Sequence, residues 1–376
     1  MAKKSKKKNI SKFKNQNQNQ NLPVTLPFKK ITTSKSIHDT TINHCFLSKT
    51  NNYIILNSAS YLSILDPINF KVLSKTVMDS KILFIIELSN NRILLSNAWT
   101  IFIYEVINNT KLNLLYYYEE KDWNKWGILE CTEIKNENIL IISPIYFKYY
   151  KQSKENVLEL YDTFNLGKIL TLKYEGYGTQ FKSAFIINNN NEFLILLTCL
   201  EIYIINHNKK TLVKKLEIEK TKVHLKYLNL DSTYTLVYHK KKLMLFNNKY
   251  LEIDTQLELS KENEEITCIK KLKKDKIIVY GTNMGKIYIF NYITSEIIKE
   301  INFESQIFNV VWIKELNDNT IVNNLPKSEI GFINYENGDL LGKLSLKNSL
   351  NYRRGVYIEK TKKLFLCCAN NSAVLE

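Results

Sequence analysis

Lysine side chains crowd the start of the chain. Lys3, Lys4, Lys6, Lys7 and Lys8 fall within six residues, and residues 1–36 hold ten lysines and no acidic residue, a charge of +10. The rest of the chain has 43 basic and 37 acidic residues, or about +6. Clustered cations attract a polyanion with salt-sensitive affinity and little sequence specificity. We therefore predict nuclear import and contact with RNA phosphates, with a merely solubilising tail as the alternative.

A second group of residues could bind a protein partner. The segment 147–155 reads Phe-Lys-Tyr-Tyr-Lys-Gln-Ser-Lys-Glu. Exposed aromatic rings beside lysines anchor protein interfaces. We predict that Phe147, Tyr149 and Tyr150 form a docking loop, with packing between structural units as the alternative.

A pair of arginines could bind phosphate. Tyr352-Arg353-Arg354-Gly355 holds two of the three arginines in the chain, and bidentate arginine suits phosphate oxygens. The segment resembles the Phe/Leu-Arg-Arg-Gly motif of the phosphoinositide-binding propellers (the PROPPIN family). That resemblance implies a lipid headgroup contact through Arg353 and Arg354. An ordinary surface pair is the alternative.

The sequence carries no catalytic signature. It has no P-loop, GxSxG or GxGxxG motif, and its five histidines show no HxH or HExxH spacing. Six cysteines are scattered through apolar runs without a CxxC pair, so we expect free thiols in a reducing compartment. No run of about 18 apolar residues predicts a membrane span. We predict a non-enzyme that has no cofactor, no metal and no small-molecule substrate.

The elements that position these residues follow a repeat. An apolar, strand-like run ends seven times in an acidic or amide residue, with gaps of 39, 57, 44, 41, 44 and 43 residues by subtraction. A period in the low forties is typical of a β-propeller, in which each repeat is one four-stranded blade. The seven residues are Asp66, Glu105, Asp162, Asn206, Asn247, Asn291 and Asn334.

The sixth repeat shows the pattern most clearly. Residues 266–272, 277–280, 287–291 and 296–301 read as four strands, with Gly281-Thr282-Asn283-Met284-Gly285 as the turn between the second and third. This repeat resembles a WD-repeat blade, with Phe290-Asn291 in place of the aromatic-Asp pair that ends the third strand. The resemblance covers residues from about 28 to 376. No Trp-Asp or Gly-His pair occurs, so the buried Asp–His–Ser/Thr–Trp network of that family should be mostly absent.

The ends of the chain predict how the propeller closes. One period after Asn334 lies at the end of the chain, so residues 356–359, 364–369 and 372–375 read as three strands of a last blade. Residues 28–33 could supply the fourth, which would remove exposed sheet edges. We predict an all-β chain forming one propeller of seven or eight four-stranded blades, with eight favoured by the repeat count.

The sequence predicts two parts of the chain, a basic tail and a folded domain. Residues 1–22 form a basic, Asn/Gln-rich tail that cannot bury enough apolar surface to order itself, and residues 23–376 form the propeller. The excess of the 57-residue gap should lie near 147–155, between the second and third strands of the third blade. Tyr116, Tyr117 and Tyr118 should lie on another loop at the rim or a face.

These features predict a non-catalytic, protein-interacting scaffold of a nuclear complex. The basic tail with a propeller is similar in layout to nucleolar ribosome-assembly factors, which implies work in pre-rRNA processing, protein partners in a multi-subunit complex, and RNA contact through the tail. A phosphoinositide-binding propeller at membranes and a cytoplasmic adaptor with an inert tail are the alternatives.

Overall fold

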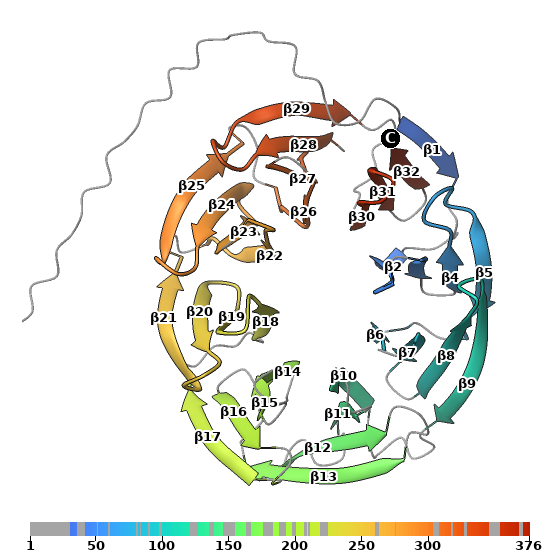
Figure 1. The fold of residues 1–376 in the computed structure, drawn as a ribbon, viewed down its shortest axis with the longest axis vertical. Coiled ribbons are helices and arrows are strands. Elements are labelled where there is room, and N and C mark those ends of the chain that lie inside the picture. The colour runs from blue at the N-terminus through green and yellow to red at the C-terminus, as the bar shows by residue number, and fades with distance from the viewer. Residues whose placement is uncertain are drawn as a thin grey trace, which may run out of the picture.

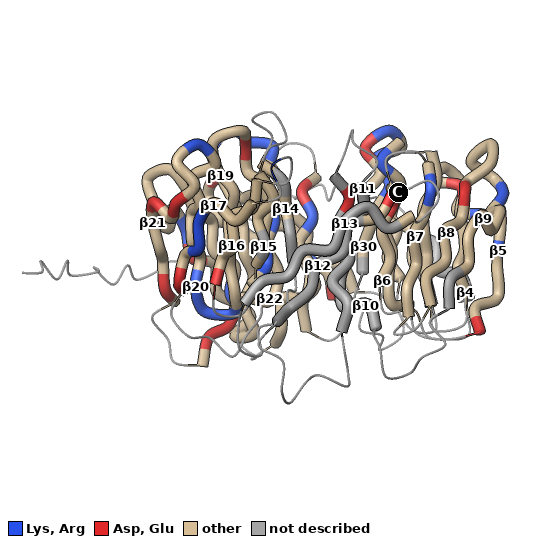
Figure 2. The backbone as a smooth tube through the Cα atoms, turned by 90° about the horizontal axis from the view of Figure 1, so that it is seen from below, with Lys and Arg blue, Asp and Glu red and all other residues tan. Residues whose placement is uncertain are grey.

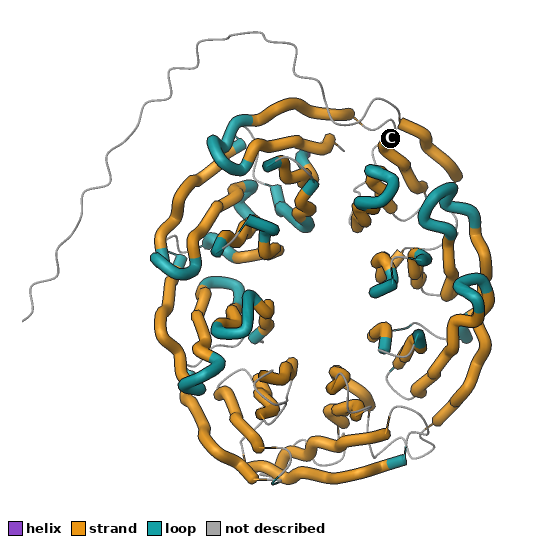
Figure 3. Tube along the Cα trace, in the orientation of Figure 1, coloured by secondary structure: helices purple, strands orange, loops and turns teal. Residues whose placement is uncertain are grey.

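The structure is a computed structural model of the 376-residue chain. It describes residues 31–35, 42–50, 52–58, 61–79, 82, 84–88, 91–97, 100–119, 127–134, 139–145, 155–162, 167–175, 183–187, 193–197, 201–206, 209, 211–218, 225–259, 263–274, 276–303, 308–316, 319–326, 329–345, 354–367 and 371–376. These residues form strands and turns, and among them there is no helix that could cross a membrane (Figure 3).

The described strands form eight four-stranded antiparallel sheets, arranged around a common axis in Figure 1. We number the sheets in chain order and call their strands a to d from the axis outward. The first four sheets are β2 (Ile42–Leu47), β3 (Ile54–Ser58), β4 (Tyr61–Leu65) and β5 (Val72–Val77); β6 (Phe84–Glu87), β7 (Arg92–Ser96), β8 (Thr100–Ile107) and β9 (Lys111–Glu119); β10 (Gly127–Ile134), β11 (Ile139–Ile145), β12 (Glu155–Asp162) and β13 (Lys168–Glu175); and β14 (Ser183–Ile187), β15 (Phe193–Leu197), β16 (Glu201–Asn206) and β17 (Thr211–Glu217).

The remaining sheets continue the same order. They are β18 (Lys226–Asn229), β19 (Tyr234–Tyr238), β20 (Lys242–Asn247) and β21 (Glu252–Glu258); β22 (Ile266–Lys271), β23 (Ile277–Thr282), β24 (Lys286–Asn291) and β25 (Glu296–Asn302); β26 (Ile313–Glu315), β27 (Thr320–Asn324), β28 (Glu329–Asn334) and β29 (Leu340–Ser345); and β30 (Arg354–Ile358), β31 (Lys363–Cys367), β32 (Asn371–Leu375) and β1 (Ile31–Lys35). The all-β prediction is confirmed, and each sheet has the form of one propeller blade.

The eighth sheet combines the two ends of the chain. β1 pairs antiparallel with β32, with Ile31 opposite Leu375 and Lys35 opposite Asn371. The first strand of the described chain thus lies at the outer edge of a sheet whose other strands come from the last 23 residues. The predicted donor segment, 28–33, overlaps β1, and its residues 28–30 lie outside the described part of the chain.

Burial explains why the middle strands are almost wholly apolar. In the sixth sheet every residue of β23 is buried, whereas β25 exposes its first five residues. The core lies between neighbouring sheets, as where Val279 and Ile289 of the sixth sheet pack with Ile321 and Ile333 of the seventh. A strand covered on both faces reads as a continuous apolar run, and an outer strand does not.

In five of the seven repeats, the repeat residue builds the turn between strands c and d. Its side-chain oxygen accepts backbone N–H groups two or three residues further along, as an Asx turn does. Asp66 Oδ1 accepts from Ile68 at 2.6 Å, and Asn291 Oδ1 accepts from Ile293 at 2.9 Å. Equivalent bonds occur at Asn206, Asn247 and Asn334. Turn geometry therefore explains the acidic or amide residue at these five positions, whereas Glu105 lies inside β8, which continues to Ile107.

A buried polar network in the sixth sheet differs from the WD-repeat pattern. Tyr288 and Thr282 each donate a 3.1 Å hydrogen bond to Glu264 Oε1, and Glu264 is buried. The pKa of Tyr288 is raised, mainly by burial and next by the negative charge of Glu264. A carboxylate, a threonine and a tyrosine thus satisfy one another here without histidine or tryptophan.

One prediction about the rim was wrong. Tyr116, Tyr117 and Tyr118 belong to the outer strand β9 rather than to a loop, and Tyr117 packs against Phe102 with ring centroids 5.4 Å apart. The long gap of the third repeat does fall between strands b and c, since β11 ends at Ile145 and β12 begins at Glu155.

Candidate functional site

Most of the site residues that the sequence predicts lie outside the described residues. These are Lys3, Lys4, Lys6, Lys7 and Lys8 of the tail, Phe147, Tyr149 and Tyr150 of the proposed docking loop, and Arg353. Arg354 is the first residue of β30, where it pairs with Cys367, so it begins a strand rather than a connection. These predicted contacts with nucleic acid, protein and phosphate therefore remain predictions.

The fifth sheet differs from the others in the residue at a β-bulge of strand d. In each of the first seven sheets the pairing of strands c and d shifts by one residue, which leaves one extra residue in strand d. Six of these extra residues are aliphatic: Leu73, Leu115, Ile169, Val213, Ile298 and Leu341. The fifth sheet has Asp254 instead. Bulges re-aim side chains at sheet edges, so a carboxylate here has a defined direction.

Asp254 is held by the repeat residue of its own sheet. Asn247 Nδ2 donates a 2.8 Å hydrogen bond to Asp254 Oδ2. Asn247 Oδ1 accepts the N–H groups of Lys249 and Tyr250 at 3.0 and 3.1 Å. One amide therefore fixes both the turn and the carboxylate.

Tyr234 lies beside this carboxylate. Strand register places Tyr234 opposite Asn247, and Asn247 opposite Glu252. Burial raises the pKa of Tyr234, and the charge of Asp254 together with a hydrogen bond to it raises the pKa further. The Tyr234 N–H is anchored by Asp231 Oδ1 at 2.7 Å. The backbone of Tyr234 is thus held by Asp231 at the start of β19.

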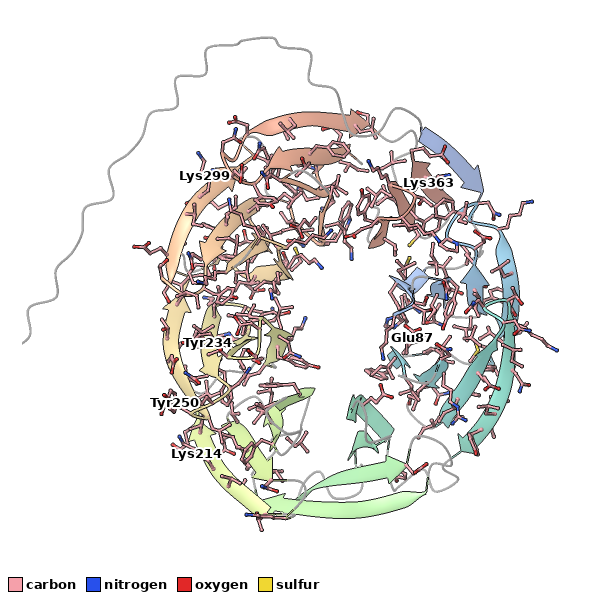
Figure 4. The ribbon with its side chains drawn as sticks, viewed as in Figure 1. Glu87, Lys214, Tyr234, Tyr250, Lys299 and Lys363 are labelled. Carbon is pink, nitrogen blue, oxygen red and sulfur yellow. The ribbon has the colours of Figure 1, made fainter. Side chains whose placement is uncertain are left out.

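Tyr250 adds an exposed ring to the same surface. Its side chain is 61% exposed, and its backbone N–H donates to Asn247 Oδ1 at 3.1 Å. Lys249 Nζ lies 5.3 Å from the centre of the Tyr250 ring, within the range of a cation–π contact. Figure 4 labels Tyr234 and Tyr250 on the fifth sheet, with Lys214 of the neighbouring fourth sheet.

The outer strand of this sheet is acidic. Glu252, Asp254 and Glu258 are exposed on β21, which has no lysine or arginine. Among the described residues, no ion pair involves these three carboxylates, whereas Glu265, Glu336 and Glu376 each pair with a lysine. Figure 2 shows lysine and acidic positions together in the turns at the edge of the ring where the chain ends.

We name Tyr234, Tyr250, Glu252, Asp254 and Glu258 the fifth-sheet surface. Carboxylates beside tyrosine rings attract a cationic side chain through charge, hydrogen bonding and cation–π contact. The described residues contain no group of three or more His, Cys, Asp or Glu that could hold a metal ion. The described cysteines Cys45, Cys268 and Cys367 form no disulfide with one another, and burial raises the pKa of Cys268 to about 12.

Sequence reasoning missed this surface, although a signal was available. The residue seven positions after the repeat residue is aliphatic in the first, third, fourth, sixth and seventh repeats, and it is Asp254 in the fifth. Aligning the repeats at that position would have marked the exception. Aligning the repeats could not have predicted that Tyr234, which lies twenty residues earlier in the chain, belongs to the same surface.

Comparisons with known proteins support the fold. The sequence matches no protein-family model, and no curated protein matches it by sequence. Among solved structures, Sqt1 of Saccharomyces cerevisiae is similar with a TM-score of 0.68 and 10% identity, over 90% of this chain and 97% of that one. The dihydro-heme d1 dehydrogenase NirN, solved in complex with DHE, is similar with a TM-score of 0.63 and 10% identity, over 82% of this chain and 67% of that one.

These likenesses show a propeller-type fold and nothing finer. Since one of the two similar structures is named as a dehydrogenase, the fold alone does not decide whether the chain is catalytic. The WD-repeat family itself stays a prediction from the strand pattern.

Proposed function

We propose that this chain is a non-catalytic, protein-interacting scaffold of a nucleolar ribosome-assembly complex that processes pre-rRNA. The observation that carries the proposal is the division of charge, with +10 in residues 1–36 and about +6 in all the rest. A lysine tail without acids suits nuclear import and RNA phosphates. The sheets supply several separate surfaces for proteins.

The rigidity of the turns supports the scaffold role. The c–d turns are held by the side chains of the repeat residues, as at Asp66 and Asn291, so exposed side chains such as Ile68 and Ile293 stand on fixed backbone. A platform that is already ordered loses little conformational entropy when it binds a partner.

The test is affinity purification of the full-length protein beside a form lacking residues 1–22. We expect ribosome-assembly factors and pre-rRNA with the full-length protein, and weaker recovery of pre-rRNA without the tail. Fluorescence microscopy of the protein with and without residues 2–14 should show loss of nucleolar signal. Cytoplasmic partners that are unchanged by the deletion would contradict the proposal and favour an adaptor with an inert tail.

A further inference from the structure

The joint between the eighth and first sheets differs from the other joints in how the chain crosses it. Between the other neighbouring sheets, strand d of one sheet leads along the chain to strand a of the next. Here strand d is β1, which comes from the other end of the chain and is held to β32 by a ladder from Ile31–Leu375 to Lys35–Asn371. We propose that the c–d turn of the first sheet is a latch that closes this joint, and that its release opens the ring there.

Two kinds of contact join this turn to the eighth sheet. The Phe70 ring stacks on the Phe365 ring of β31, with centroids 5.1 Å apart and planes 9° apart. Lys363 Nζ donates a 3.2 Å hydrogen bond to Ile68 O and pairs with Glu376 Oε1 at 2.8 Å. It also lies 5.9 Å from the centre of the Phe70 ring. We call these five residues the latch, because they connect the turn with β31 and with the residue that follows β32.

The backbone at Phe70 is unusual for an aromatic residue. Its φ of 61° lies in the left-handed region, which is strained for residues with a Cβ and easy for glycine. The residue four positions after the repeat residue has a positive φ in four other c–d turns as well, namely Asn109, Leu251, Ser295 and Gly338. The turn therefore requires the conformation but not a phenylalanine. A strained aromatic residue at such a position indicates that the contacts of its ring hold it there.

The geometry of the turn directs this side chain toward the preceding sheet. Leu251, at the same position in the fifth sheet, packs against the core between the fourth and fifth sheets. At Gly338 of the seventh sheet, a Cβ would lie 2.6 Å from Lys299 Cε of the sixth sheet. The sheet that precedes the first in the ring is the eighth (Figure 1), and Phe70 packs against the core between these two sheets. Its ring thus crosses the joint.

The core behind the latch is apolar. It contains Ile54 and Leu56 of β3 together with Val356 of β30 and Val374 of β32. Apolar packing is not directional, whereas a stacked ring pair and a lysine hydrogen bond require a defined geometry. The latch therefore sets how the first sheet lies against the eighth. It can also be removed without touching the ladder between β1 and β32.

The experiment is hydrogen exchange of the full-length protein, followed by mass spectrometry of its peptides. Phe70→Gly relieves the strained φ and removes the stacked ring, so the turn itself should not suffer. We expect amide exchange in β2 and β30, which pack on each other across the joint, to become about tenfold faster. Exchange in β22 to β24 should stay as in the wild type. Lys363→Met keeps the apolar part of the side chain, removes both polar contacts, and should affect the same two strands.

Matched controls come from equivalent positions. Leu251→Gly changes the same turn position in the fifth sheet, and should speed exchange in the fourth and fifth sheets without affecting β2 or β30. Lys360→Met changes an exposed lysine of the eighth sheet and should leave exchange as it is. Faster exchange confined to the joint in either latch variant supports the proposal. Wild-type exchange of β2 and β30 in both latch variants would overturn it, as would an equal acceleration in all sheets, which would mean a general loss of stability.

Discussion

The backbone N–H of Lys273 lies 2.9 Å from each carboxylate oxygen of Glu315, and so ties the a–b turn of the sixth sheet to strand a of the seventh. Lys49 and Glu87 repeat the arrangement between the first and second sheets, with the N–H of Lys49 at 2.7 Å from Glu87 Oε2. In both cases the lysine side chain pairs with a carboxylate one sheet further on, Glu133 or Glu359. Each such link therefore joins three successive sheets.

Removing the Glu315 carboxylate should loosen this link. Glu315→Ala removes the acceptor of the exposed Lys273 N–H, and we expect a loss of about 0.5–1.5 kcal/mol in the free energy of unfolding. Glu315→Gln keeps one acceptor oxygen and should cost less. Urea denaturation followed by tryptophan fluorescence measures both. Equal stability of the alanine variant and the wild type would show that the link adds nothing.

The same residue predicts a pH dependence. Burial is the largest influence on Glu315 and raises its pKa, although the Lys273 N–H and nearby lysines oppose the shift. A pKa that is higher in the folded state gives stability that is present below the unfolded value, about 4.3, and is lost as the pH rises through the folded value. The stability of the wild type relative to Glu315→Gln should therefore fall as the pH rises above about 4.3. A difference that rises with pH would contradict this sign.

The repeat residues should tolerate exchange between amide and acid but not truncation. Asn291→Ala removes the acceptor for the N–H groups of Ile293 and Thr294, and should cost about 1 kcal/mol, as loss of a comparable cap does. Asn291→Asp copies Asp66 and should be nearly neutral. Thermal unfolding of the two variants tests the comparison, which fails if both melt alike.

The strand β1 should contribute more to stability than the segment before it. Deleting residues 1–35 exposes the edge of β32, and we expect a lower melting temperature and aggregation through that edge. Deleting residues 1–22 leaves β1 in place and should preserve the melting temperature. Differential scanning calorimetry with light scattering distinguishes the two. Similar behaviour of both deletions would mean that β1 adds little.

RNA binding should depend on the tail and on salt. Replacing Lys3, Lys4, Lys6, Lys7 and Lys8 by alanine should weaken binding to a single-stranded RNA and reduce the slope of log affinity against log salt, because fewer counterions are released. Filter binding over a range of salt concentrations measures the slope. An unchanged slope would show that the tail does not contact the RNA phosphates.

The arginine pair gives a separate test of the membrane alternative. Arg353→Thr with Arg354→Thr should leave vesicle flotation unchanged if the chain is a nucleolar scaffold. Loss of flotation on phosphoinositide vesicles in this double variant would favour membrane recognition instead.

Short-range patterns account for what sequence reasoning predicted well. The sixth repeat divides into β22 to β25, and each strand lies within two residues of its predicted bounds at either end. These elements follow from alternation, turn residues and the spacing of the Asx turn, all of which act over a few residues. Tyr116–Tyr118 were misplaced because the bulge at Leu115 breaks the alternation that marks a strand.

The sequence by itself determined the repeated strands and their turns, because backbone geometry and local hydrogen bonds impose the period. The sequence also determined the charge of the tail, because net charge depends on composition and not on the fold. Only the tertiary structure brought Tyr234, Asn247 and Asp254 together, since their contact depends on strand register across three strands. The links from Lys49 to Glu133 and from Lys273 to Glu359 likewise join residues more than eighty positions apart, and only the packing of successive sheets decides such distances.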